Sequence, residues 1–450
     1  MPDGIEQTTH GGRAWTNGPA VAGKEELLVL CPRCGGRLAL GPMCFAGMPV
    51  LVECRCPNCG GDYWLDWPAG HALLHPTIIH RDDGSLYFDG SEWYPRRLQR
   101  LLRTRADPVA ARINIRTHAT SSDRAIVTNC IDFLYGHSLL KLASGVSFAR
   151  HDPADLVLIV PKQLAWLVPA AATAIEVDIP FRSGGQWIAG LDEAVRETVG
   201  AYRQIVIAPA VSQPPLSGDD VAQLLGKGLA PTLFWDRTDD QDEPGVTIVL
   251  REDRLWLGGR EPFLIRLARR ISPGTSRRLA AEHQLRCVAR MVEELRQRVP
   301  GVRLTAVGLG TTGRLPSEVS DLRTAEMTEA REREWLEAYA RSRVVVGVHG
   351  SNMLLPSALG GAVVDLLPVE KLGNITQDLV IAGESEREPK LCLFRYRILP
   401  ATTEPRVVAA TVASILAAAD RHLHNVIDNR AAYDSVGWPR SITWHRAGTR

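Results

Sequence analysis

The stretch Arg343-Val-Val-Val-Gly-Val-His-Gly-Ser-Asn352 decides the fold. An amphipathic helical pattern precedes it, a short helical segment, Met353–Leu359, follows, and the apolar run Ala362–Leu367 comes next. This order of strand, loop, helix and strand places a polar loop at the carboxyl end of a parallel sheet. Glycine lets the backbone approach a ligand, and the following helix offers free N–H groups to an anion. We therefore expect this loop to bind a phosphate-bearing molecule, with a nucleotide as the expected ligand.

Short apolar strands alternate with helical patterns on both sides of this unit. One run extends from Ala125 to Ala208, and a second begins at Gly245. Such alternation predicts an α/β fold with parallel sheets covered on both faces. The polar stretch Ser212–Glu243 contains Pro-Pro, Gly-Asp-Asp and a run of acids, so we place an interdomain connection there.

Composition limits the class of protein. The chain has 450 residues, a net charge of +1, 23% charged and 45% apolar residues, values that are ordinary for a globular protein of two or three domains. The balanced charge gives no general reason to bind nucleic acid or an anionic membrane. No apolar run has the length of a signal-peptide core near the N-terminus or of a spanning helix. We expect a soluble, cytoplasmic protein without a transmembrane segment, in which the basic stretch Arg96–Arg105 could reach a membrane surface peripherally.

Two copies of Cys-Pro-x-Cys-Gly indicate a metal site in a reducing compartment. Two such turns supply four thiolates to a tetrahedral Zn²⁺, which would be structural because the protein fills every position. Cys54 is an alternative to Cys56, with a worse spacing to Cys59. The module could dock nucleic acid, a partner protein or a substrate, or it could be a small stabilising core, which we favour. The predicted ligands are Cys31, Cys34, Cys56 and Cys59.

The sequences Val-Gly-Val-His-Gly-Ser-Asn-Met-Leu-Leu-Pro and Val363-Val-Asp-Leu-Leu-Pro368 resemble the signature of family 61 glycosyltransferases. That family has an apolar strand, His-Gly-Ala, an Asn or Thr, and a strand ending in an acidic residue and Pro. Here Ser351 replaces the usual Ala, and Asp365 stands where Glu is commoner. The resemblance is good over Glu329–Pro368, diffuse from Asn129 to about Pro400, and absent from the first hundred residues. It implies the GT-B architecture, in which two Rossmann-like parallel-sheet domains face a cleft.

The resemblance also implies a donor site on the second domain. The turn after the strand would contact phosphate or ribose, the acid at position 365 would bond a ribose hydroxyl, and an arginine pair would neutralise the departing diphosphate. Simpler roles are also open: a core histidine, a helix cap, a solvated turn residue, and a salt bridge with Glu252 or Asp253. The candidate residues are His349, Gly350, Ser351, Asn352, Asp365, Arg251 and Arg254.

A catalytic base is expected on the first domain. The family often has an Asn-x-x-His element there, and this chain has Tyr135-Gly-His137 in a looser match. An inverting transfer needs a base to take the acceptor proton. His137 or Asp132 could act so, and a buried core histidine is the alternative. No Asp-x-Asp lies on a suitable loop, because Asp239–Asp242 belongs to the polar connector, so we expect no catalytic metal.

These observations predict an inverting, metal-independent glycosyltransferase, active in polysaccharide biosynthesis or a related modification, with a UDP-sugar as the favoured donor and a glycan, lipid or protein as the acceptor. One alternative is a GDP-fucose-dependent, fucosyltransferase-like enzyme, which Gly136-His-Ser-Leu-Leu-Lys-Leu142 faintly resembles. Another is a non-catalytic zinc-ribbon protein that binds nucleic acid or a partner. The predicted segments are a disordered tail (1–24), a zinc ribbon (25–70), a hairpin and basic linker helix (71–120), an acceptor domain (121–215), a nucleotide-sugar domain (245–402), and a C-terminal helix with a return segment (403–450).

Overall fold

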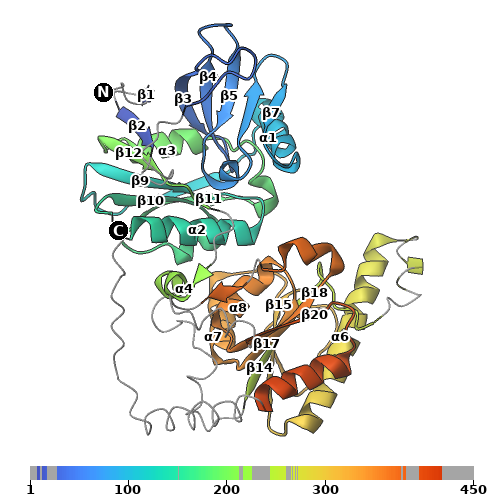
Figure 1. Ribbon diagram of the computed structural model, residues 1–450. Helices are drawn as coiled ribbons and strands as arrows, with labels where there is room; N and C mark the ends of the chain where they lie inside the picture. The colour runs from blue at the N-terminus through green and yellow to red at the C-terminus, as the bar shows by residue number, and fades with distance from the viewer. Residues whose placement is uncertain are drawn as a thin grey trace, which may run out of the picture.

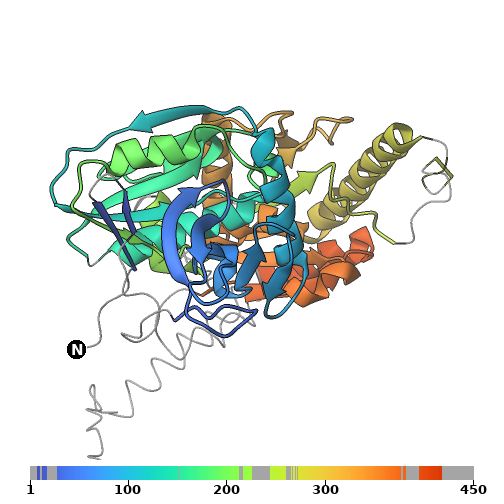
Figure 2. The ribbon, with the colours of Figure 1, turned by 90° about the horizontal axis from the view of Figure 1, so that it is seen from above.

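The computed structural model confirms the α/β fold class (Figure 1). No helix among its described residues is long and apolar enough to cross a membrane. Three sheet units stack in series: a five-stranded unit, a seven-stranded sheet and a six-stranded sheet, and Figure 2 looks down the stack with the five-stranded unit nearest the viewer. The structure describes residues 8–10, 13–17, 28–150, 152–211, 216–225, 244–259, 265, 267–268, 270, 272–376, 379–381 and 395–417.

The seven-stranded sheet has the order β1-β2-β12-β9-β10-β11-β8. Its four central strands are parallel, as the alternation of strands and helices predicts. The helix that follows β9 is buried along most of its length and lies between this sheet and the six-stranded unit. The elements are β9 (Arg124–Asn129), α2 (Tyr135–Ala149), β10 (Asp155–Pro161), η3 (Lys162–Leu167), β11 (Thr173–Asp178), α3 (Leu191–Val199) and β12 (Gln204–Ile207).

Both edges of this sheet differ from the prediction. Strand β8 (Arg112–Arg116) lies in the segment predicted to be a linker, but it pairs antiparallel with β11 and makes the sheet mixed. Because β8 is an edge strand, it is polar and lacks the apolar run by which a buried strand is predicted. Strands β1 (Thr8–His10) and β2 (Arg13–Asn17) lie in the predicted disordered tail, and β2 pairs with β12. The free edge of β12 accounts for this pairing, since an edge strand offers unpaired backbone groups.

The six-stranded sheet is entirely parallel, in the order β16-β15-β14-β17-β18-β20. Its long helix, α6, is capped at its start by the Ser272 hydroxyl, which accepts a hydrogen bond from the Thr275 N–H. The last strand lies at Tyr396–Pro400, a helix covers 405–417, and the predicted return segment lies outside the described residues. The other elements are β14 (Gly245–Arg251), α6 (Pro273–Arg298), β15 (Arg303–Leu309), β16 (Val319–Asp321), α7 (Glu329–Arg341), β17 (Val344–Val348), η7 (Ser351–Met353), α8 (Leu354–Leu359), β18 (Ala362–Leu367) and η8 (Val369–Asn374).

The cysteine-rich segment forms the antiparallel sheet β3-β4-β5-β6-β7. It is packed on the seven-stranded sheet, since Phe45, Val52 and Leu65 share one apolar core with Val127 and Ile175. The two units therefore fold as one body. Its elements are β3 (Ala39–Phe45), β4 (Val50–Arg55), β5 (Asp62–Asp66), η1 (Gly70–Leu73), β6 (Thr77–His80), β7 (Leu86–Phe88), α1 (Trp93–Arg103) and η2 (Thr104–Ala106).

The two large units also meet through a buried interface. Leu139 and Leu164 of the seven-stranded unit lie in one apolar core with Leu336 and Leu354 of the six-stranded unit. At its margin the buried Glu332 carboxylate accepts hydrogen bonds from the Tyr135 hydroxyl at 2.5 Å and the Trp166 indole N–H at 3.0 Å. A small parallel pair, β13 (Leu216–Ser217) with β19 (Val380–Ile381), and α4 (Gly218–Leu225) also connect the units.

Candidate functional site

The four predicted metal ligands come together in the five-stranded unit. One Sγ atom from each of Cys31, Cys34, Cys56 and Cys59 lies within 4.8 Å of all the others. Gly35 and Gly60 take left-handed φ values of 70° and 72°, which closes each turn over its first cysteine. Four thiolates at this separation fit a tetrahedral zinc ion. The cluster is therefore a possible zinc site.

Cys54 does not belong to this group. Its buried thiol points toward the Val52 carbonyl oxygen, at 3.6 Å within its own strand. The structure thus groups Cys56, and not Cys54, with Cys31, Cys34 and Cys59, as the spacing predicted.

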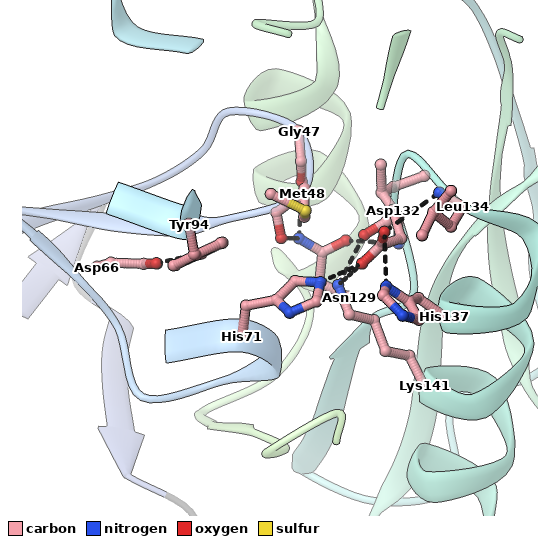
Figure 3. Close-up of polar contacts among 11 residues, drawn as sticks. Gly47, Met48, Asp66, His71, Tyr94, Asn129, Asp132, Leu134, His137 and Lys141 are labelled. Carbon is pink, nitrogen blue, oxygen red and sulfur yellow. Dashed lines mark hydrogen bonds and ion pairs between the residues drawn. The ribbon is translucent and has the colours of Figure 1, made fainter. Parts of the chain in front are cut away.

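A second cluster surrounds Asp132, in the loop that joins β9 to α2 (Figure 3). The Asp132 carboxylate is buried and lies 2.9 Å from His71 Nε2 and 2.9 Å from the Lys141 ammonium. On its other side, His137 Nδ1 lies 3.4 Å from Oδ1, and the Leu134 backbone N–H donates to the same oxygen at 3.2 Å. The two histidines and the lysine therefore converge on one carboxylate.

Three elements bring this cluster together. Asn129, at the end of β9, bonds the carbonyls of Gly47 and Met48 through its side-chain amide, which fixes the five-stranded unit beside the loop. The short helix η1 then carries His71 inward. On α2, His137 and Lys141 are four residues apart and therefore lie on one face of the helix.

The protonation states follow from this geometry. Burial opposes ionisation of Asp132, but Lys141 and the two histidines outweigh it and hold the Asp132 pKa well below its ordinary value. Burial lowers the pKa of His71, against the hydrogen bond to Asp132. The central group is thus a carboxylate.

His71, Asp132 and His137 are also close enough to hold a metal ion. The Lys141 ammonium already lies against Asp132 Oδ2 and donates to the Ile131 carbonyl oxygen at 3.0 Å. A cation in that position repels a second one, so we interpret the cluster as a proton-transfer arrangement. Asp132 orients the His137 ring, whose side chain remains 8% exposed.

In the predicted donor loop, the Arg254 guanidinium lies against the turn at Gly350. Gly350 has a φ of 139°, and a Cβ atom there would lie 1.5 Å from an Arg254 nitrogen, so only glycine lets the guanidinium lie against the turn. Arg254 also donates to the Asn352 side-chain oxygen at 3.1 Å. The structure therefore brings Arg254, Gly350 and Asn352 together, with Ser351 beside them in the turn.

Two of the predicted contacts lie below the surface. The His349 side chain has no exposed area, and its nitrogens lie 2.5 Å from Asp365 and 3.0 Å from the Asn374 carbonyl oxygen. Asp365 is buried within β18 rather than placed at its end. His349 and Asp365 therefore do not make the predicted ligand contacts. Both ring nitrogens of His349, which a ligand would need, are already used beneath the turn.

Arg251 also differs from its predicted role. It forms a bidentate ion pair with Asp253, with both distances 2.7 Å. This is the salt bridge that the sequence left open as the alternative.

The candidate base and the candidate donor turn lie next to each other. A Cβ atom on Gly136 would lie 2.5 Å from Ser351 Cβ, so the start of α2 is in close contact with the turn. To one side, a cleft of about 660 Å³ separates the two large units and is lined by Trp166, Asp178, Glu332 and Arg333, among others. The start of α2, which follows β9, and the turn that follows β17 are thus in contact.

Sequence reasoning missed His71 and Lys141. Lys141 had a signal, since it lies one helical turn after His137. His71 had none, because it lies 61 positions before Asp132, the carboxylate it contacts, in a different unit.

No family model matches this chain, and no curated protein matches its sequence.

Proposed function

We propose that this protein is an inverting glycosyltransferase of the GT-B type, which transfers a sugar from a nucleotide-sugar donor, with UDP favoured, to a glycan, lipid or protein acceptor. The observation that carries the proposal is the contact between Gly136, which precedes the candidate base His137, and Ser351, in the turn that Arg254 lies against. Inverting transfer needs a base on one side of the anomeric carbon and neutralisation of the leaving diphosphate on the other. The loops at the start of α2 and after β17, which are in contact, are suited to supply the base and the neutralising cation.

The donor diphosphate would bind at the second sheet. Arg254 is the cation held at the turn, and Asn352 orients it through the 3.1 Å hydrogen bond. His349 and Asp365 would position this turn from below, which supports the site without contact with the nucleotide. Arg254 can carry the diphosphate charge without a metal ion, which supports a metal-independent reaction.

His137 would act as the general base. The Asp132 carboxylate, 3.4 Å from Nδ1, would orient the ring with Nε2 as the proton acceptor and would stabilise the imidazolium that forms. Lys141 keeps Asp132 ionised, and His71 holds the second carboxylate oxygen. This arrangement favours His137 over Asp132 as the base, since Asp132 is occupied by its partners.

The cysteine-rich unit would be a structural zinc ribbon, with the two large units as Rossmann-like domains. Its shared core with the seven-stranded sheet supports a stabilising role. The non-catalytic alternative, a ribbon that docks nucleic acid, is less well supported because much of the ribbon's apolar surface is already covered.

Turnover of UDP-sugars and GDP-fucose tests this proposal. Released nucleotide is measured for the wild-type chain and for His137→Ala, which should reduce the rate by about 10²–10⁴ if the base is lost. His118→Ala is the matched control, since that residue is exposed and bonds Thr173 through its backbone N–H rather than through its ring. Release of GDP alone would favour the fucosyltransferase-like alternative. Equal rates in wild type and His137→Ala would refute the assigned base.

A further inference from the structure

We propose that α1 and the loop after β9 form an acceptor subsite for a sugar that carries a negatively charged group, a carboxylate or a phosphate. The subsite rests on the proposed function, because it adjoins the assigned base. It consists of Trp93 and Arg97 on α1 and of Phe133 in the loop. Neither the metal cluster nor the donor turn explains these side chains.

An aromatic surface lies next to His137. The Trp93 ring centroid is 5.3 Å from that of His71 and 6.5 Å from that of Phe133, and Phe133 is 6.1 Å from His137. Trp93 is 41% exposed, which is unusual for so large an apolar ring. The apolar C–H face of a pyranose packs well on such a ring. A sugar there would place its hydroxyls near the base.

Arg97 adds a positive charge to this surface. Its guanidinium lies over the Phe133 ring, 3.7 Å from the centroid. Within the described part of the chain it makes no hydrogen bond or ion pair, and its Nε atom is buried without a partner. Burial lowers its pKa, and the neighbouring Arg100 lowers it further. The cation is thus held in place by stacking while its hydrogen-bonding capacity is unused.

The nearby Asp132 carboxylate does not provide a hydrogen-bond partner for Arg97. Asp132 is already paired with Lys141 at 2.9 Å, and its remaining oxygen faces His137. Arg96, the neighbour of Arg97 in the helix, pairs with Glu92 at 2.6 Å and is therefore satisfied. An anionic group on the substrate would give Arg97 the partner that the protein does not provide, in a geometry that suits carboxylate or phosphate.

The test compares binding of glucuronate, glucose 6-phosphate and glucose by saturation-transfer NMR. We expect both charged sugars to bind more tightly than glucose, and Arg97→Gln to remove this preference, a loss of about ten- to a hundredfold for a charged hydrogen bond. Arg96→Gln should leave the preference unchanged, and Trp93→Ala should weaken all three sugars. Circular dichroism confirms folding, which Arg97→Gln should not affect because that side chain makes no hydrogen bond or ion pair with a described residue.

The outcomes separate the subsite from the proposed function. Equal binding of glucose and the charged sugars, no binding of any, or an unchanged preference in Arg97→Gln overturns the subsite even if the enzyme turns over nucleotide sugars. Charged-sugar binding that depends on Arg97, without turnover of any nucleotide sugar, supports the subsite and counts against the transferase. If glucuronate and glucose 6-phosphate differ, the better one identifies the charged group.

Discussion

The buried pair of Asp132 and Lys141 gives the most quantitative prediction for the candidate site. Both side chains are at most 1% exposed, and the charged atoms are 2.9 Å apart. Removal of one partner from such a pair costs about 3–5 kcal/mol, because it leaves a buried charge uncompensated. The two single variants should fall at opposite ends of that range.

Lys141→Met should cost the smaller amount, about 3 kcal/mol. Asp132 keeps His71 and the Leu134 N–H as partners, and a proton taken up by a histidine can restore the charge balance. Asp132→Asn should cost about 5 kcal/mol, since the ammonium would keep only the Ile131 carbonyl. The double variant should cost about 3 kcal/mol less than the sum of the single costs, which is the coupling of the pair.

Native-state hydrogen exchange is the assay, because peptides from β9 and α2 report the opening free energy of this unit in a chain with several domains. Lys162→Met is the matched control. Its ion pair with Asp178 is shorter, at 2.6 Å, but exposed, so the loss should be below about 1 kcal/mol. Additive single costs, or equal effects of Lys141→Met and Lys162→Met, would refute the reasoning.

Three further predictions concern other parts of the fold. Burial raises the pKa of Asp66 to about 7, so the stability that the protonated carboxyl contributes is complete below its ordinary pKa of about 4 and is lost as pH rises from there through about 7. Asp66→Asn should therefore be similar to wild type near pH 4 and more stable at pH 8 in urea unfolding. Cys31→Ser should lose zinc and several kcal/mol of unfolding free energy, whereas Cys54→Ser should keep the metal, as mass spectrometry of the metal content will show. Gly136→Ala should cost about 1–3 kcal/mol from the clash with Ser351, and Ser351→Gly should recover part of the loss in the same unfolding assay; an equal loss in both backgrounds would contradict the contact.

Much of the six-stranded unit could be predicted because its strands are apolar and its helices amphipathic. The strand at Ala362–Leu367 matches the prediction residue for residue. Local patterns suffice there, since a fully buried parallel strand has to be apolar along its whole length.

The edges and the site were harder, because both depend on contacts between distant segments. Strand β8 is polar and short, so only its pairing with β11 identifies it. His71 reaches Asp132 only after the five-stranded unit has packed on the sheet. The family resemblance predicted a ligand contact at His349, but the sequence could not tell that His349 would use both its nitrogens inside the protein.

Nucleotide binding by isothermal titration calorimetry tests the central claim most directly. UDP is titrated, with EDTA present, into the wild-type chain, Arg254→Gln and the control Arg251→Gln, whose arginine is already paired with Asp253. The account predicts binding that Arg254→Gln weakens at least tenfold, a loss of about 1.4 kcal/mol, and that Arg251→Gln leaves nearly unchanged. Absence of binding by UDP and GDP alike, or equal affinity in wild type and Arg254→Gln, would contradict a nucleotide-sugar site at this turn.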